Sequence, residues 1–520
     1  MRRLLALIGC ALLSIPAAPA AAGEPLDPQV ADDIRDYVKG ILSELGVPGA
    51  AVVVVDRDGA LFSEGYGKAD DSGRAATPQT PFRIASLSKQ LTGLAVMQLV
   101  ESGDLSLEAT VHDYLPWFGA DGSDTARITV RDLLAHGSGW GERDGTLPAT
   151  TTDVDAGAME RNARRLADTP VVNPIGEFRY MNGTYDLLGY LVAVVSGTSF
   201  EEYLQAHVLD PLGMTHTYLS QADARAGGVA QGHYPFFGVL IPYEIPYYRA
   251  ALPSASIVAS AEDLGHVLMA HLNEGRYEDR SVVSPSAMAQ LHEPLVRPFE
   301  DVVGYGWGWW SYPLYGVGDR TPGDSPRYEA PMILEHGGSL PTFASDMVIM
   351  PEAGYGIVVL MNRNDELAPS RFYQMHLGIA TILSGKPAPA LVAYDEPIRA
   401  YGRIIAVGIP LLQLGGLVLA ARRLRRWRRE PPPLRHSRRW QLAHLVVPLV
   451  VDLGVPIFLW WIFFTTARLE PTDYFRVFPH TPDAALSLLA IAVLGLGWGV
   501  VRTWLTLRVV RATQAEAQPA

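Results

Sequence analysis

Three apolar stretches in the last 120 residues constrain the fold more than any other feature of this 520-residue chain. They cover residues 402–421, 443–464 and 484–505, and each is close to the roughly 20 residues that a membrane-spanning helix needs. The loop between the first two holds nine arginines and one glutamate, and such short basic loops stay in the cytoplasm. We therefore predict three transmembrane α-helices over 402–505, followed by a cytoplasmic tail, 506–520.

Asp452 is an acidic residue in the middle of the second predicted span. Ionisable side chains inside a membrane are costly and often functional, but they also pair with arginine and support helix packing. The sequence leaves these roles open.

The N-terminus predicts export. Arg2 and Arg3 precede an apolar run and the small-residue stretch PAAPAAAG, which is typical of a secretory signal peptide over residues 1–22. The only cysteine, Cys10, lies in that signal, so the mature chain can form no disulfide and no thiolate metal site. We expect no metal and no cofactor.

Residues 401–520 are basic, whereas the rest of the chain is acidic. The formal net charge of −13 combines +9 in residues 401–520 with −22 in residues 1–400. Nucleic-acid binding needs basic patches that neutralise phosphates, so an exported part this acidic argues against it. Together with the signal peptide, the basic loop predicts a multi-pass protein of the bacterial cell membrane, with its large domain periplasmic or extracellular.

Hydrophobic patterns in the exported part of the chain predict an α+β architecture. GAAVVVVDRDGALFSEGYGKAD is typical of two strands joined by a tight turn, and FASDMVIMPEAGYGIVVLMNR of a second hairpin near residue 350. Helical patterns occupy the region between them. Strands at both ends and helices in the middle favour a single antiparallel sheet shared by the first and last strands. Residues 386–401 read as a linker to the membrane.

The stretch FRIASLSKQLTG contains Ser86-x-x-Lys89 at the start of a helical pattern. Two residues three apart on a helix share a face, so the two side chains can meet. Lysine is rare here, with four among 42 basic residues, and unlike arginine it can lose its proton in a protein. Ser86 is therefore a candidate nucleophile and Lys89 its base.

Two further segments add to this pair. Tyr180-x-Asn182 stands just before a predicted helix, and His336-Gly337-Gly338 just before a predicted strand. In this order, the three motifs resemble those of serine hydrolases of the β-lactamase and penicillin-binding-protein family, and the flanking sequence is most similar to class C β-lactamases, D-Ala-D-Ala carboxypeptidases and related esterases.

The resemblance covers residues 26–385 and implies a β-lactamase-like domain there, with an antiparallel sheet flanked by helices plus a helical subdomain. It also implies roles for the motif residues. Ser86 would be acylated, Lys89 would accept its proton, and Tyr180 would be the general base or proton relay. Asn182 would hold the substrate amide and Lys89.

The same resemblance places the oxyanion hole at the backbone amides of Ser86 and Ser339, with Gly337 and Gly338 leaving room for the substrate. His136 follows a predicted helix among glycines, and we interpret it as structural rather than catalytic.

His336 stands where the β-lactamases proper carry a lysine. A lysine is a fixed cation, whereas histidine is often neutral at pH 7, so we expect weak recognition of substrate carboxylates. Because an unperturbed histidine titrates near 6.5, acidification towards pH 5.5 should charge His336 and improve that recognition.

The sequence thus predicts a membrane-anchored exported serine hydrolase that forms an acyl-enzyme. Its substrates would be small-molecule or peptide compounds with ester or amide bonds, either simple acyl or D-amino-acid-containing. The alternatives are a receptor or transducer for a β-lactam or muropeptide, and a true β-lactamase or D-Ala-D-Ala carboxypeptidase. No protein partner is indicated.

Overall fold

The structure is a computed structural model of the whole chain. It describes residues 25–141, 153–299, 302–314, 331–365, 372, 374–390, 396–429, 446–466 and 482–515. The predicted signal peptide, 1–22, lies outside these residues.

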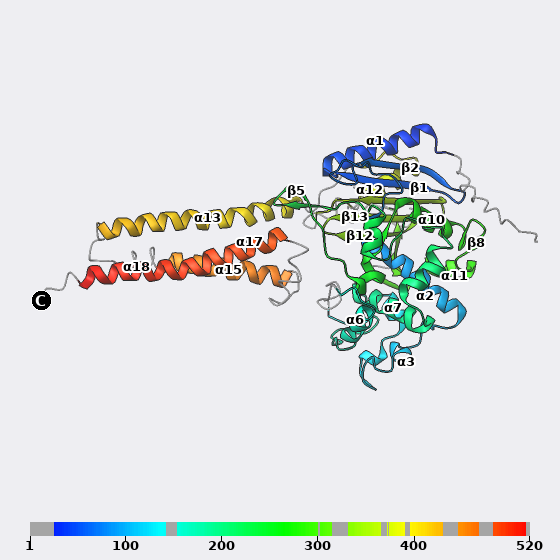
Figure 1. Cartoon of the computed structure of the whole chain (residues 1–520), viewed down its shortest axis with the longest axis horizontal. Helices are drawn as coiled ribbons and strands as arrows, with labels where there is room; N and C mark the ends of the chain where they lie inside the picture. Colours follow the sequence, from blue (N-terminus) through cyan, green and yellow to red (C-terminus); the bar gives the residue numbers. More distant parts are fainter. Residues whose placement is uncertain are drawn as a thin grey trace, which may run out of the picture.

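An eight-stranded antiparallel sheet forms the centre of the N-terminal domain (Figure 1). The first strand pairs with the last, with Ala50 opposite Met361, which confirms the expected α+β architecture. In spatial order the strands are β2 (Ala60–Gly67), β1 (Gly49–Val55), β14 (Tyr355–Met361), β13 (Phe343–Met350), β12 (Met332–Leu340), β11 (Trp309–Pro313), β10 (Val303–Gly306) and β9 (Val296–Phe299).

Both faces of the sheet are covered, so its central strands read as continuous apolar runs. Strand β1, GAAVVVV, is buried at every position. One face packs against α1 (Pro28–Leu45) and α12 (Met375–Leu383), and the other against α10 (Ala261–Leu272) and the helical subdomain. Figure 1 shows α1 and α12 on the side of the sheet opposite the helical subdomain.

Local signals set the ends of these helices. The side chain of Asp27 accepts a hydrogen bond from Gln29 N, and Pro28 occupies the first turn of α1. Gly46 ends the same helix in the left-handed conformation, and Gly103 ends α2 in the same way.

The helical subdomain lies between β2 and β9 in the sequence. Its helices are α2 (Ser88–Ser102), α3 (Val111–Tyr114), α4 (Val130–Leu134), α6 (Ala158–Ala167), α7 (Asn182–Ser196), α8 (Phe200–Leu204), α9 (Gln221–Ala226) and α11 (Pro285–His292), with the short turns η1 (Ala85–Leu87), η2 (Thr125–Arg127), η3 (Gln205–Leu209), η4 (Arg249–Ala251) and η5 (Leu252–Ser256). Three small two-stranded pairs join β3 (Phe82–Arg83) to β6 (Val258–Ala259), β4 (His233–Phe236) to β5 (Val239–Pro242), and β7 (Arg276–Tyr277) to β8 (Arg280–Ser281).

The C-terminal region is a bundle of long helices that extends away from the sheet domain (Figure 1). It comprises α13 (Glu396–Arg429), α15 (Val447–Thr466), α17 (Pro482–Ala492), η9 (Val493–Gly497) and α18 (Trp498–Ala515). Helix α13 therefore begins inside the predicted linker, and α18 continues into the predicted tail.

Two of the three predicted spans have the length and apolarity to cross a membrane: Ile404–Arg423, and Pro482–Arg508 across α17, η9 and α18. The apolar part of α15, Leu449–Trp461, is shorter. The start of the second predicted span, residues 443–445, lies outside the described residues.

Within the bundle, Asp452 of α15 forms an ion pair with Arg502 of α18, at 2.7 Å. Of the roles that the sequence left open for Asp452, arginine pairing across two helices is the one that this geometry supports.

Candidate active site

Ser86 lies in η1, the short turn between β3 and α2. Ala85 immediately before it has a positive φ of 50°, which is unusual for a residue other than glycine and turns the chain sharply. The turn is held from two sides: Ile84 N donates to Ile257 O, and Ser345 Oγ of β13 donates to Ile84 O. The Ser86 side chain stays partly exposed at the N-terminus of α2.

Lys89, in the first turn of α2, is fully buried beside Ser86. Its Nζ lies 3.1 Å from Ser86 Oγ, 2.8 Å from Asn182 Oδ1 and 2.9 Å from Ser254 O. The last two atoms are carbonyl oxygens and can only accept hydrogen bonds, whereas the Ser86 hydroxyl can also donate. A neutral lysine has two N–H groups and one lone pair, so it can donate to both carbonyls while its lone pair faces Ser86.

Burial lowers the pKa of Lys89 to about 7, although the nearby carboxylate of Asp186 opposes this shift. The cause is desolvation, because a charged ammonium loses its hydration inside the protein. Burial likewise raises the pKa of Asp186 to about 7, so this carboxyl is only partly ionised at neutral pH. A substantial fraction of the Lys89 side chains is therefore neutral at pH 7.

Tyr180 lies two residues before α7 and donates a hydrogen bond from its hydroxyl to Ser86 Oγ, at 3.0 Å. Its ring centroid is 5.0 Å from Lys89 Nζ. Burial is the main reason why the pKa of Tyr180 lies above its usual value of 10, despite the hydrogen bond to Ser86. The phenol is consequently protonated at neutral pH and is available as a donor.

His336, on β12, is 3% exposed, and its ring lies 5.9 Å from that of Tyr180. Its Nδ1 is 2.7 Å from Gly337 O. A carbonyl oxygen only accepts, so Nδ1 carries the proton and Nε2 is an acceptor. Nε2 is buried and has no hydrogen-bond partner in the described part of the chain.

Burial, followed by the charge of Lys89, lowers the pKa of His336 to about 3. The expectation that His336 becomes charged near pH 5.5 is therefore wrong. It started from the pKa of a solvated imidazole, whereas the sheet and the Tyr180 segment exclude water from this one.

Gly338 and Ser339 continue β12 beside the Ser86 turn. A Cβ atom on Gly338 would overlap with Ser345 Oγ and with Ile84 O, so glycine is needed here for the close approach of the strand to the turn. The expected role of Gly337 and Gly338 in leaving room for the substrate stays a prediction. The exposed Ser339 accepts a hydrogen bond at Oγ from Asn364 Nδ2, at 2.8 Å.

The structure thus brings Ser86, Lys89, Tyr180 and Asn182 into direct contact and places the His336–Ser339 segment next to them. Besides Asp186, it adds two groups that were not assigned to the site from the sequence. Ser254 contacts Lys89 through its backbone carbonyl, from η5, and no side-chain pattern could have revealed that contact.

His136 is the second addition. It is fully buried, its Nδ1 accepts from Met181 N at 3.2 Å, and its Nε2 lies 3.0 Å from the Tyr305 hydroxyl. It thereby satisfies an N–H group at the start of α7 and packs its ring 4.4 Å from that of Tyr180. The structural role expected for His136 takes a specific form here, because the residue positions the segment that carries Tyr180 and Asn182.

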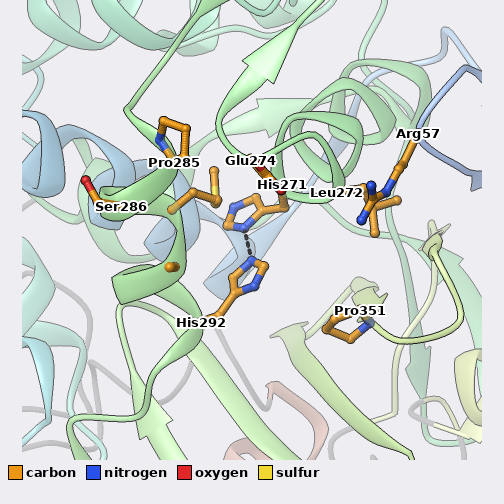
Figure 2. A pocket seen from close by; sticks show the side chains of 10 residues that line it. Arg57, His271, Leu272, Glu274, Pro285, Ser286, His292 and Pro351 are labelled. Atoms are coloured by element: carbon orange, nitrogen blue, oxygen red, sulfur yellow. Dashed lines mark hydrogen bonds between the residues drawn. The ribbon is translucent and has the colours of Figure 1, made fainter.

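A pocket of about 500 Å³ lies apart from these residues, between α10, α11 and the β1–β2 and β13–β14 turns (Figure 2). Figure 2 shows His271 and His292 in it, joined by a hydrogen bond of 3.0 Å between Nδ1 and Nε2. None of the predicted site residues lines this pocket.

This chain is similar to known proteins over most of its length. "Protein flp" of Staphylococcus aureus (strain MW2) is 29% identical over 479 residues, which cover 89% of this chain and 83% of that protein. The alignment therefore extends past the sheet domain into the C-terminal helices. "Penicillin-binding protein 4" of Amycolatopsis lactamdurans is 29% identical over 371 residues, covering 69% of this chain and 92% of that protein.

Among solved structures, a class C beta-lactamase superposes with a TM-score of 0.58 at 21% identity, over 69% of this chain and 97% of that one. At this identity the likeness shows a common fold. The family model described as Beta-lactamase matches residues 31–379, which include Ser86, Lys89, Tyr180 and His336. This chain therefore belongs to the Beta-lactamase family and is a serine-hydrolase-like protein with a class C β-lactamase-like fold.

Proposed function

We propose that this protein is a membrane-anchored serine hydrolase that forms an acyl-enzyme at Ser86. One observation carries the proposal: Ser86 Oγ lies within hydrogen-bond distance of both Lys89 Nζ and the Tyr180 hydroxyl, and burial makes the lysine partly neutral. A nucleophilic serine needs an adjacent base, and this constellation supplies one.

In the first step the Ser86 hydroxyl proton passes to Lys89 Nζ while Oγ bonds to the substrate carbonyl carbon. The carbonyl oxygen becomes an oxyanion, for which the backbone amides of Ser86 and Ser339 are the proposed donors. When the bond to the leaving group breaks, the Tyr180 hydroxyl supplies a proton to that group and regains one from Lys89. Water then attacks the acyl-enzyme by the reverse proton path, which releases the acid and restores Ser86.

The proposed substrates are esters or amides of small acyl or D-amino-acid-containing compounds. A neutral His336 offers a hydrogen-bond acceptor at Nε2 and no fixed positive charge. It therefore suits a substrate hydroxyl or N–H group better than a carboxylate. For this reason we prefer an esterase or peptidase to a true β-lactamase or D-Ala-D-Ala carboxypeptidase.

Ser86 labelling tests this proposal. The full chain, purified in detergent, is treated with a fluorophosphonate probe, and the labelled peptide is identified by mass spectrometry. Label should appear on Ser86 and vanish in Ser86→Ala, while Ser102→Ala, an exposed serine on the same helix, should label normally. Equal labelling of Ser86→Ala and the wild type would refute the assignment.

Membrane anchoring is part of the same proposal. Side chains of α13 such as Leu412 and Ile404 are 76% and 64% exposed, and none of the apolar segment Ile404–Arg423 is buried within the protein. A helix of this kind is unfavourable in water and favourable in lipid. The Asp452–Arg502 pair is consistent with this, because charged groups inside a membrane pair with one another.

Reporter fusions test the topology. A phosphatase fused after Ala400 should be active outside the cytoplasm, and a cytoplasm-dependent reporter fused after Arg429 should be active inside it, because the arginine-rich loop is retained there. The predicted orientation would be contradicted if both of these fusions were inactive while the exchanged fusions, the cytoplasm-dependent reporter after Ala400 and the phosphatase after Arg429, were active.

A further inference from the structure

A second cluster of ionisable side chains lies on the far side of the sheet from Ser86. Glu335 of β12, Asp346 of β13 and His376 of α12 are 8%, 0% and 2% exposed. One ligand atom from each lies within 4.8 Å of the others. Glu335 precedes His336 on the same strand, and successive strand residues point to opposite faces, so Glu335 points away from the active site and towards α12.

The strand register brings these groups together. Asp346 lies opposite Gly337 in the β12–β13 pair, and cross-strand partners share a face of the sheet. Gly337 has no side chain, so Glu335, two residues earlier on the same face, and His376 from the covering helix can both approach Asp346.

Several polar atoms of this cluster lack hydrogen-bond partners. Both carboxylate oxygens of Asp346 and both ring nitrogens of His376 lack a hydrogen-bond partner among the described residues. The closest approach, 3.3 Å between His376 Nδ1 and Asp346 Oδ1, is an ion-pair distance. Glu335 Oε2 accepts from the Tyr312 hydroxyl at 3.2 Å. Buried polar atoms are nearly always paired, so Asp346 Oδ2 and His376 Nε2, which are not the atoms of this closest contact and have no hydrogen-bond partner among the described residues, indicate a missing partner.

The charges lead to the same conclusion. Two carboxylates face a single imidazole, in a core that also contains Ile333, Val348 and Ile379. If both carboxyl groups are ionised, even a protonated His376 leaves one negative charge uncompensated, and no lysine or arginine forms an ion pair with the three residues in the part of the chain that the structure describes. Buried charges need a counter-ion or a metal.

We propose that Glu335, Asp346 and His376 bind one divalent transition-metal ion, with Zn²⁺ as the preferred cation. Two carboxylate oxygens and one imidazole nitrogen form a ligand set that such ions accept. Zinc–ligand distances of about 2.0–2.2 Å place ligand atoms roughly 3–4 Å apart, so small side-chain rotations close the present cluster around an ion. Tyr312 then acts as an outer partner that fixes the Glu335 carboxylate.

The proposed metal site would connect β12, β13 and α12 on the face of the sheet opposite His336. No metal was expected from the sequence because the mature chain has no cysteine. This ligand set contains no cysteine. Its three ligands come from separate elements and form no motif with recognisable spacing, so only the folded chain brings them together.

Metal content is the direct test, and it does not depend on hydrolysis. The full chain is purified in detergent without chelators, and its zinc is measured by elemental analysis. We expect about one zinc ion per chain, removal by a strong chelator with a lower melting temperature, and recovery of both on adding ZnCl₂. Replacement by Co²⁺ should give the visible absorption of a protein-bound cobalt site.

Variants assign the site. Asp346→Asn and His376→Gln should each lower zinc affinity at least tenfold, with folding checked by circular dichroism. His292→Gln is the matched control, because His292 and His271 form the other close histidine pair and lie in the separate pocket of Figure 2. If one of the two cluster variants fails to fold, the zinc affinity of the other variant and the zinc stoichiometry of the wild type still test the proposal.

Two results would overturn the proposal. A folded wild-type chain that carries no zinc and gains no thermal stability from Zn²⁺, Mn²⁺ or Co²⁺ would show that the cluster holds shared protons instead. Zinc binding that survives both cluster variants but is lost in His292→Gln would place the ion in the other pocket.

Discussion

The pKa of Lys89 should control the rate at which Ser86 is acylated. A lysine in water has a pKa of 10.5, so only about one in 3,000 would be neutral at pH 7, whereas burial brings the pKa to about 7 and makes about half of them neutral. This difference corresponds to ~5 kcal/mol in favour of the neutral form. Because the neutral form is the active one, the rate should fall about tenfold per pH unit below pH 7 and level off above it.

The measurement is the second-order rate of fluorophosphonate labelling from pH 5 to pH 10, with the full chain in detergent. Lys89→Arg should reduce that rate by roughly 10²- to 10⁴-fold at all these pH values, because a guanidinium cannot accept the proton. Lys68→Arg, a change at an exposed lysine, should behave like the wild type. A wild-type rate that keeps rising up to pH 10 without levelling off above pH 7 would refute this reasoning, because the base would then titrate like a solvated lysine or a phenol.

The remaining predictions concern groups around Ser86. Tyr180→Phe should keep the pH midpoint near 7 but slow turnover roughly a hundredfold or more, since it removes a proton donor and leaves the base; steady-state kinetics with an activated ester and a poor leaving group would show the larger loss for the latter. His336→Lys should raise the ratio of kcat/KM for a carboxylate-bearing ester to that for its methyl ester, whereas lowering the wild type to pH 5.5 should leave this ratio unchanged, because the pKa of His336 is about 3. Gly338→Ala should abolish labelling and lower the melting temperature, because its Cβ would overlap with Ile84 O, whereas Gly40→Ala, in α1 with open space around it, should do neither.

The sequence predicted the parts of this protein that depend on local patterns. Runs of β-branched residues predicted β1 and β14, and the antiparallel pairing of first and last strands followed from their positions in the chain. The contact between Ser86 and Lys89 is also local, because helical spacing alone brings them within 3.1 Å.

What the sequence did not predict depends on packing between distant segments. Lys89 meets Asn182 across 93 positions and Ser254 across 165, and only the closure of α7 and η5 over it excludes water. The pKa values of Lys89 and His336 follow from that closure, which is why the histidine prediction based on a solvated side chain failed. The cluster behind the sheet was missed for the same reason.

Strand β12 links the two sites, because neighbouring residues on it face opposite sides. His336 borders the Ser86 side, and Glu335 belongs to the cluster under α12. Gly338 of the same strand packs so tightly against the Ser86 turn that not even a methyl group fits between them. Close-packed interiors transmit strain, so we expect a shift of β12 caused by changes at Glu335 or His376 to reach this contact. Such a shift would move the Ser86 turn or Ser339, which carry the amides proposed to stabilise the oxyanion.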